Sequence, residues 1–208
     1  MPRAGLRHAG FECMDDKYTC FAALAARETA GRDYRIRIIE RRGAPVLVVA
    51  PHGGTIEVGT SELAGLVAGA EHSLFVFEGL KPRGPSRDLH ITSHRFDHPQ
   101  CLSLASRCPI TLALHGCRGE SHLYLGGLDR RLKSVLEKHL GAAGLPVSAE
   151  GHRYLGRHPL NICNRGTRGR GAQIEITHDL RTGSRLHLIA GAVRSGLHEY
   201  VAQLNLLR

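Results

Sequence analysis

The segment APVLVVA, residues 44–50, is a short and uninterrupted run of apolar residues, and it limits the folds open to this chain. A strand with no alternating polar residues must be covered by protein on both faces, as happens inside parallel sheets. Two further apolar segments, LFVFEGL at 74–80 and PITLALHG at 109–116, are also predicted to be strands. These segments predict a sheet with helices on both sides.

The remaining segments complete an alternation of helices and strands. We predict helices over residues 17–29, 61–70, 128–144 and 190–207, and further strands over 33–42, 89–95, 146–148 and 173–177. Thr60 or Ser61 is the expected N-cap of the second helix. This order is typical of an α/β fold, a three-layer sandwich around a mixed, largely parallel central sheet. Functional sites in such folds gather at the carboxyl ends of the strands.

Length and charge restrict the function. The chain of 208 residues contains no Pro/Ser-rich linker, so we take residues 1–208 as a single domain. Lys and Arg outnumber Asp and Glu by 28 to 19. This excess favours an anionic partner, either nucleic acid, an acidic polymer or an acidic small substrate, although an Arg-rich genome explains it equally well. An aromatic content of 5% without Trp makes nucleic-acid stacking a poor fit.

The sequence also bears on location. The N-terminal segment MPRAGLRHAGFECMDDKYTC lacks the apolar core of a signal peptide, and no segment reaches the roughly 18 apolar residues of a membrane span. We expect a cytoplasmic protein with no membrane partner, while release by other routes stays open. The six cysteines form no CxxC pair, so they suit a reducing compartment, mostly as small core residues.

Two predicted strands end in the dipeptide His-Gly, at His52 and at His115. If both strands are central and parallel, both imidazoles reach the same edge of the sheet. Glu57 follows His52 in the same loop, so two nitrogens and a carboxylate can converge. A catalytic zinc uses this kind of ligand set, with three protein ligands and a fourth position open to water. Alternatively, the histidines bond to the backbone and Glu57 is a solvated residue near a helix N-terminus.

Glu175 is the candidate catalytic carboxylate. In the segment AQIEITH, strand alternation places Gln173, Glu175 and Thr177 on one face. An acidic residue in the middle of a short strand is costly to bury without a purpose. A zinc hydrolase needs a carboxylate that takes a proton from water and passes it to the leaving amine. The alternative is an edge strand with a solvated polar face.

Several segments resemble one known family in the same order. They are DKYTCFAALAARETAGRDYRIR, APHGGTIEVGTSELA, FEGLKP, DLHITSHRFDHP, ALHGCRG, YLGGLD, NICNRG and AQIEI. Together they resemble the phage-related poly-γ-glutamate hydrolase family, whose fold is similar to that of the zinc carboxypeptidases. The resemblance implies that His52, Glu57 and His115 ligate zinc and that Glu175 is the catalytic carboxylate. It also implies γ-linked polyglutamate as the substrate.

The chain departs from the zinc carboxypeptidases in two respects. Those enzymes separate their first His and Glu ligands by two residues, whereas four residues separate His52 from Glu57. Their adjacent Asn-Arg pair, which holds the substrate carboxylate, precedes the third ligand, whereas Asn164 and Arg165 follow His115. The pair is therefore not carried over by position. Asn164, Arg165 and also Arg118, three residues past His115, are kept as substrate-binding candidates.

Three other features have competing interpretations. HITSHRFDHP, residues 90–99, would offer a second metal site if it were helical, but its residues favour a strand and a loop with a structural or substrate-facing role. Arg165, Arg168 and Arg170 lie in the loop NRGTRGRGA, where they would form a phosphate site, a cationic cleft for polyglutamate carboxylates, or a solvated loop. Cys117 has no assignable partner histidine, which favours a buried thiol over a nucleophile.

We therefore expect a zinc-dependent amide hydrolase that cleaves γ-glutamyl linkages of poly-γ-glutamate. One alternative is a hydrolase of the same fold that acts on another acidic amide, such as an N-acyl amino acid or a γ-glutamyl peptide. The other is a basic nucleic-acid-binding protein with structural histidines, which the low aromatic content disfavours. The sequence leaves the oligomeric state open.

Overall fold

A seven-stranded sheet runs through the structure, a computed structural model that describes residues 16–82 and 84–205. Its strands are β1 (Tyr34–Ile39), β2 (Val46–Gly54), β3 (Ser73–Gly79), β4 (Ile110–Cys117), β5 (Leu123–Gly126), β6 (Val147–Ser148) and β7 (Ala172–Thr177), in the spatial order β1-β3-β2-β4-β7-β5-β6. The pairs β1/β3 and β5/β7 are antiparallel, and the other neighbours are parallel. The prediction of a mixed, largely parallel sheet is confirmed.

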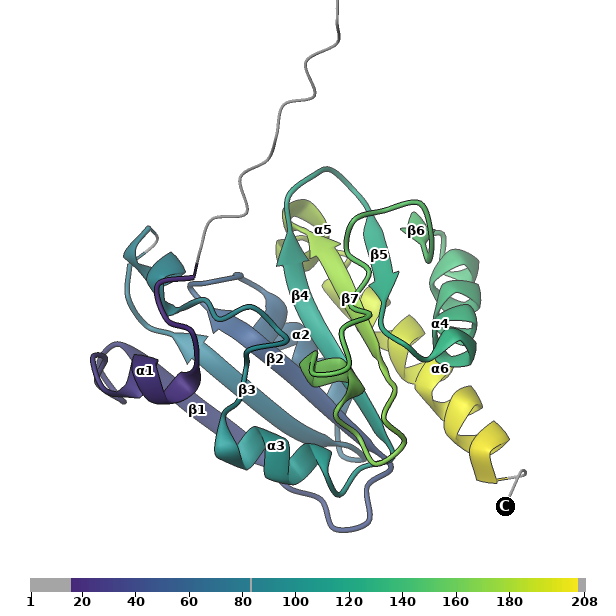
Figure 1. Ribbon diagram of the computed structural model, residues 1–208. Coiled ribbons are helices and arrows are strands. Elements are labelled where there is room, and N and C mark those ends of the chain that lie inside the picture. The colour runs from purple at the N-terminus through teal and green to yellow at the C-terminus, as the bar shows by residue number, and fades with distance from the viewer. Residues whose placement is uncertain (1–15, 83, 206–208) are drawn as a thin grey trace, which may run out of the picture.

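Helices cover both faces of the sheet (Figure 1). They are α1 (Phe21–Ala25), α2 (Thr60–Ala68), α3 (Pro99–Ala105), α4 (Arg130–Ala142), α5 (His178–Thr182) and α6 (Leu186–Asn205), with short 3-10 turns η1 (Pro85–Leu89) and η2 (Ile162–Asn164). Helices α2, α4 and α6 contribute to one apolar core, whereas α1, α3, η1 and η2 contribute to a second core on the opposite face. The three-layer arrangement is therefore confirmed. None of the described helices is long and apolar enough to cross a membrane.

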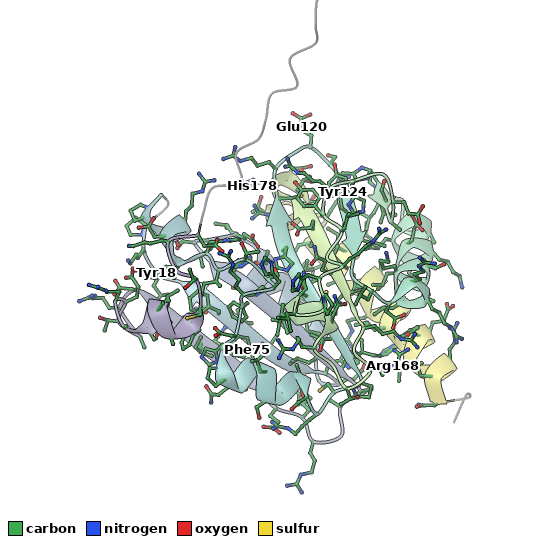
Figure 2. All side chains as sticks on the ribbon, in the orientation of Figure 1. Tyr18, Phe75, Glu120, Tyr124, Arg168 and His178 are labelled. Atoms are coloured by element: carbon green, nitrogen blue, oxygen red, sulfur yellow. The ribbon has the colours of Figure 1, made fainter. Side chains whose placement is uncertain are left out.

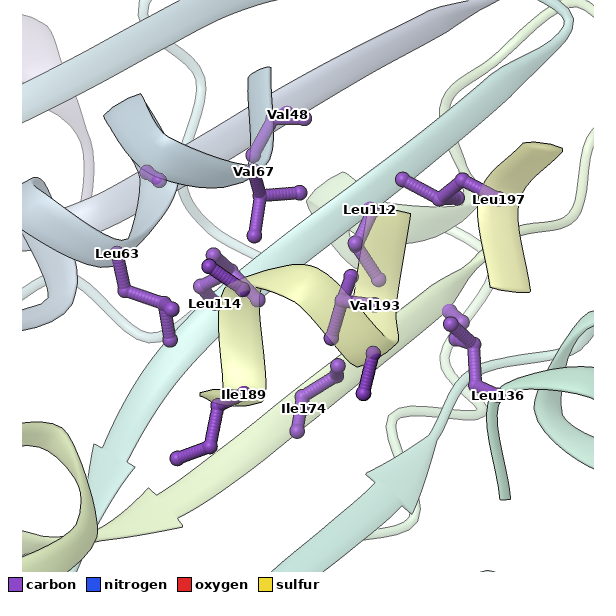
Figure 3. Packing of buried hydrophobic residues seen from close by; sticks show 14 of the residues in the cluster. Val48, Leu63, Val67, Leu112, Leu114, Leu136, Ile174, Ile189, Val193 and Leu197 are labelled. Atoms are coloured by element: carbon purple, nitrogen blue, oxygen red, sulfur yellow. The ribbon is translucent and has the colours of Figure 1, made fainter. Parts of the chain in front are cut away.

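Strand alternation decides which side chains enter each core. Leu112 and Leu114 of β4 and Ile174 of β7 pack against Ile189 and Val193 of α6, as Figure 3 shows. Burying such side chains contributes roughly 1.5–3 kcal/mol each. Because successive strand residues point to opposite faces, the residues between them face the other layer. That layer receives the polar side chains of β4 and β7.

A bulge in β2 changes the direction of His52. Between Ala50 and Gly53, three steps along β2 accompany only two steps along β3, so β2 contains one extra residue. Strict alternation from Ala50, which packs in the α2/α6 core, would point His52 into that core. The bulge turns His52 to the opposite face. Pro51 stands within the bulge, and it has no N–H group to leave unpaired.

The predicted strand at 89–95 is wrong. Residues 90–98 form a loop, and its backbone groups bond to side chains and other loops instead of to a neighbouring strand. Thr92 N donates to Asp16 Oδ2 over 2.6 Å, and Ser93 O accepts from Ile162 N over 3.0 Å. Ile91 is fully buried in the second core. The apolar character of the segment therefore reflects an ordered loop that covers the sheet.

Other boundaries differ from the predictions. The first helix is limited to α1, and α3, α5 and β5 were not predicted. Gly59, with a left-handed backbone, is the N-cap of α2, so neither Thr60 nor Ser61 holds that position. Helix α6 begins four residues before the predicted start at 190. The last two residues of that predicted helix, 206–207, lie outside the described residues. Cys13 and the rest of the N-terminal segment through residue 15 also lie outside them.

Candidate active site

The three predicted metal ligands meet at the carboxyl ends of β2 and β4. His52 Nδ1 lies 3.1 Å from Glu57 Oε1 and 3.2 Å from His115 Nδ1, and His115 Nδ1 lies 3.9 Å from Glu57 Oε2. A backbone hydrogen bond from Glu57 N to His52 O, over 2.9 Å, closes the loop between these two residues. Gly54 has a φ of +64°, and a Cβ there would meet Gly79 O at 2.3 Å, so this tight turn requires glycine.

The environment of His52 fits a bound cation. Its Nε2 lies 2.9 Å from the carbonyl oxygen of Ile91. A carbonyl oxygen only accepts, so Nε2 carries the hydrogen and the lone pair of a neutral ring lies on Nδ1. That lone pair faces the acceptor oxygens of Glu57, and this contact requires a proton or a metal cation between them. Ligand atoms of a tetrahedral zinc at about 2.1 Å are about 3.4 Å apart, which agrees with the observed spacing.

The charges of these three groups are coupled. Burial lowers the pKa of His115 to about 3, so its imidazole is neutral, as a ligand must be. Burial alone would also lower the pKa of His52, but the charge and hydrogen bond of Glu57 raise it. His52 in turn keeps the pKa of Glu57 below its usual range despite burial. Gly116 N donates to Glu57 Oε2 over 2.8 Å and holds the carboxylate in place.

His90 is a fourth donor at this centre. Its ring centroid lies 4.0 Å from that of His52, and one ligand atom each of His90, His52 and Glu57 lies within 4.8 Å of the other two. Its Nδ1 is 2.7 Å from Asp16 Oδ1. The loop over residues 90–98 therefore delivers a histidine that strand periodicity could not place.

Ser93 Oγ lies 3.3 Å from His115 Nε2, whereas the other titratable side chains of the segment HITSHRFDHP lie away from the centre. The ring of His94 lies 4.8 Å from that of His158, and Asp97 accepts a hydrogen bond from Phe21 N over 2.6 Å. His98 precedes α3 and its ring lies 4.2 Å from that of Phe21. His94, Asp97 and His98 therefore have structural contacts.

Glu175 lies beside the cluster because of strand pairing. It is the register partner of His115 in the parallel pair β4/β7, so both side chains point to the same face of the sheet. Gln173 Nε2 donates to Glu175 Oε1 over 3.2 Å. Burial, together with the nearby charge of Glu57, raises the pKa of Glu175 to about 8. The structure thus brings together the four residues that the sequence singled out for chemistry.

A pocket of about 670 Å³ opens next to Glu57 and His90. Its lining contains more basic than acidic side chains, with basic groups at Lys17, Arg87, Arg118, His178 and Arg181. Figure 2 shows His178 at the same end of the sheet. Arg87 and Arg118 are exposed, which leaves both guanidinium groups accessible to an anionic ligand. A pocket of this size and charge can take an extended acidic molecule.

The other substrate-binding candidates lie elsewhere. Asn164 is 2% exposed, and its side-chain amide bonds entirely to backbone groups: it donates to the carbonyls of Gly156 and His158 and accepts from the N–H groups of Leu128 and Gly171. This pattern assigns Asn164 to bracing its loop.

The arginine-rich loop does not line the pocket either. Arg165 is absent from the pocket lining among the described residues. Arg168 donates to Asp129 Oδ2 over 2.9 Å and to the hydroxyl of Tyr200 over 2.8 Å, and Figure 2 shows it far from His178. Of the predicted substrate-binding residues, Arg118 alone borders the pocket.

Cys117 lies at the end of β4 and is 7% exposed. Burial, and then the charge of Glu175, raises the pKa of its thiol to about 12. A thiol that stays protonated at neutral pH is a poor nucleophile, which agrees with the interpretation of Cys117 as a buried thiol. The described cysteines are all free.

The chain is similar to proteins from bacteria and phage. A family model described as Poly-gamma-glutamate hydrolase matches residues 18–188. The SPbeta prophage-derived UPF0714 protein YoqZ of Bacillus subtilis (strain 168) is 39% identical over 171 residues, which are 80% of this chain and 60% of YoqZ. UPF0714 protein YndL of the same organism is 38% identical over 170 residues, 80% of this chain and 66% of YndL. The chain thus spans less than two thirds of the length of both relatives.

Solved structures share the fold. The structure of a bacteriophage poly-gamma-glutamate hydrolase superposes with a TM-score of 0.84 at 29% identity, covering 91% of this chain and all of that one. A structure described as zinc-free apo YndL superposes with a TM-score of 0.81 at 34% identity, covering 88% of this chain and 98% of that one. The segment matched by the family model, residues 18–188, includes every element that carries His52, Glu57, His115 and Glu175.

Proposed function

Because this chain belongs to the poly-gamma-glutamate hydrolase family, as the sequence motifs predicted, we propose that it is a zinc-dependent hydrolase of γ-glutamyl amide linkages in poly-γ-glutamate. The observation that carries this proposal is the convergence of His52, Glu57 and His115 beside Glu175. Two imidazoles and a carboxylate next to a further carboxylate are the components of a metal-assisted amide hydrolase.

His52, Glu57 and His115 would hold the zinc ion. The donor set and its spacing fit that metal, and the description of one YndL structure as a zinc-free form is consistent with a zinc site in the family. His90 is the alternative third ligand: its Nδ1 is bonded to Asp16, which leaves Nε2 available to a metal or to substrate, and the residue lines the pocket. We assign His90 to the substrate side of the centre. When bound, zinc supplies Lewis acidity toward an amide carbonyl and toward water.

Glu175 would move the proton. Its carboxylate accepts a proton from the attacking water and donates it to the nitrogen of the departing γ-amide. The raised pKa of the side chain suits the donating step, and a nearby cation would favour the ionised form needed for the accepting step. Gln173 bonds to Oε1 of Glu175 and fixes its orientation. Removing the hydrogen bond from Gln173 would therefore reduce turnover by misplacing the carboxylate.

Basic side chains of the pocket would bind the substrate. Poly-γ-glutamate carries one carboxylate per residue, and guanidinium groups recognise carboxylates through paired N–H donors. Arg118 directly follows the last residue of β4, and Arg87 lies in η1, just before the loop that carries His90. Both arginines line the pocket. The two arginines can bind carboxylates near the scissile amide.

Digestion of poly-γ-glutamate by the purified, tag-free protein tests the proposal. The protein is assayed as purified, after chelation, and after zinc is restored, with product length followed by gel filtration and new amines by chemical labelling. We expect shortened polymer as purified, no shortening after chelation, and recovery with about one zinc per chain. A γ-glutamyl dipeptide and single-stranded DNA serve as comparison ligands.

Three outcomes would contradict the proposal in different ways. Digestion that survives complete metal removal would exclude the metal mechanism. Cleavage of the dipeptide with an intact polymer would indicate a hydrolase of small acidic amides. Tight DNA binding by a protein that holds no zinc and cleaves neither amide would support the nucleic-acid alternative.

A further inference from the structure

A second cluster of potential metal ligands lies at the opposite end of the sheet from the candidate active site. Glu71 and His72 lie in the turn between α2 and β3, and His198 lies on α6. They border a pocket of about 320 Å³ together with Pro45, which precedes β2. Because β2 and β3 are parallel, Pro45 and His72 mark the amino ends of these strands, whereas His52 marks a carboxyl end.

His72 has an unusual environment for a buried polar side chain. It is 3% exposed, and neither of its ring nitrogens has a hydrogen-bond partner among the residues that the structure describes. Leaving a buried donor and acceptor unpaired costs free energy. Among the described residues, the ring has only a weak interaction with the backbone of Glu71, which leaves it open to an additional partner.

The two neighbouring residues complete a donor set. His198 Nε2 contacts Glu71 Oε2, while Arg194 Nη2 donates to Glu71 Oε1 over 3.2 Å and holds the carboxylate. The rings of His72 and His198 have centroids 6.2 Å apart and an angle of 68° between their planes. One ligand atom from each of Glu71, His72 and His198 lies within 4.8 Å of the other two. An exposed ion pair between His198 and Glu71 would explain their contact, but it would give the ring nitrogens of His72 no hydrogen bond of normal geometry among the described residues.

We propose that Glu71, His72 and His198 form a second metal site, which binds a divalent transition metal such as zinc and joins the α2–β3 turn to α6. Two imidazoles and one carboxylate are ligands that suit zinc and its neighbours in the first transition row. Ligand atoms of a tetrahedral zinc are about 3.4 Å apart, so metal binding requires the contact between His198 and Glu71 to lengthen.

This site acts on stability and not on the reaction. It lies at the far end of the sheet from Glu175, and α6 carries side chains that pack under β4 and β7. A metal bound only by the folded chain stabilises it by mass action. Fixing α6 to the α2–β3 turn therefore strengthens the layer that supports the candidate active site.

The experiment compares H198N with H187N in the tag-free chain of 208 residues. His198 and His187 are both exposed residues of α6, but His187 is absent from the cluster. Zinc content is measured by elemental analysis after equilibration with zinc and removal of excess. We expect H187N to hold one zinc more per chain than H198N. This difference does not depend on whether the candidate active site itself binds zinc.

Thermal unfolding gives a second measurement. Adding zinc to stripped H187N at about 100 times its dissociation constant should raise the melting temperature by about 5–10 °C more than in H198N. H72N, which removes the buried ring, should match H198N in zinc content if it folds. Equal zinc content in H187N and H198N, or equal zinc-induced shifts in their melting temperatures, would overturn the proposal.

Discussion

The Nδ1 atoms of His52 and His115 lie 3.2 Å apart, although the residues are separated by 63 positions and come from different strands. Two ring nitrogens at this distance, beside one carboxylate, repel each other unless a proton or a cation lies among them. The pairing links the two His-Gly strand ends into one centre. Its first consequence concerns metal affinity.

Replacement of His115 by Ala should abolish tight zinc binding at the candidate active site, because only two of the three assigned ligands, His52 and Glu57, would remain. H90A should keep the metal, since His90 is assigned to the substrate side. The measurement is the zinc content after dialysis against a weak chelator. Both substitutions are made in H198N, so that the second cluster does not contribute zinc. Zinc retention in H115A together with loss in H90A would exchange the roles of the two histidines.

Replacement of Glu175 by Gln should reduce turnover of poly-γ-glutamate by about 10² to 10⁴, the usual contribution of general acid–base catalysis. Zinc content should stay unchanged because Glu175 stands beside the ligands. E120Q, which alters an exposed carboxylate in the loop after β4, is the matched control and should keep normal turnover. Near-normal hydrolysis by E175Q would show that another group transfers the proton.

Replacement of Arg118 by Ala should raise the Michaelis constant for poly-γ-glutamate by about twofold to fivefold, the range of one exposed ion pair, with a smaller change in turnover. The Michaelis constant of the unaltered protein should also rise with salt, as the screening length falls from about 10 Å at 0.1 M to about 3 Å at 1 M. R131A changes an exposed arginine of α4 and serves as control. If R118A and R131A raised the Michaelis constant equally, substrate binding would depend on the overall charge of the protein and not on Arg118.

Replacement of Asp129 by Ala should lower the free energy of unfolding by about 2–4 kcal/mol. Its side chain is the N-cap of α4, accepting from Leu132 N over 3.1 Å, and it also accepts from Arg168 and the Tyr200 hydroxyl. R168A should lower the same free energy, whereas R170A should change it little because Arg170 is exposed and 3.9 Å from Asp129. Urea denaturation measures all three. If R168A raised the Michaelis constant and left the free energy of unfolding unchanged, the arginine-rich loop would be part of a substrate cleft after all.

The stability of the protein should fall in acid partly through Glu28. Although burial opposes the shift, hydrogen bonds from Lys81 and Tyr18 lower the pKa of Glu28. A carboxyl group whose pKa is lower in the folded state stabilises above its unfolded pKa of about 4.3, and this contribution is lost as the pH falls through the folded pKa. Urea denaturation at pH 6 and at about pH 3 should show a smaller loss of stability in E28Q than in E40Q, an exposed control. Equal losses would exclude Glu28 as a source of acid sensitivity.

The sequence predicted those parts of the structure that depend on local patterns. Continuous apolar runs identified β2, β3 and β4, and the alternation around Glu175 identified β7 together with the face that carries the carboxylate. The His-Gly strand ends and Glu57 then converged as expected, because parallel central strands end at one edge.

Features set by long-range contacts could not be read from these patterns. The loop over residues 90–98 is apolar like a strand, but its order comes from Asp16, Ile162 and other distant residues. The bonds that hold Asn164 and Arg168 come from segments that no local pattern connects. The proximity of His72 and His198 likewise depends on how α6 lies beside α2.

The extra residue of β2 near Pro51 makes the number of residues in this strand as important as their identity. If β2 kept its length but paired with β3 without the bulge, alternation from Ala50 would point His52 into the α2/α6 core and away from His115. Such a strand would gain regular pairing and separate the two histidines. Regular pairing of β2 with β3 and the placement of His52 therefore favour different arrangements of the same short stretch.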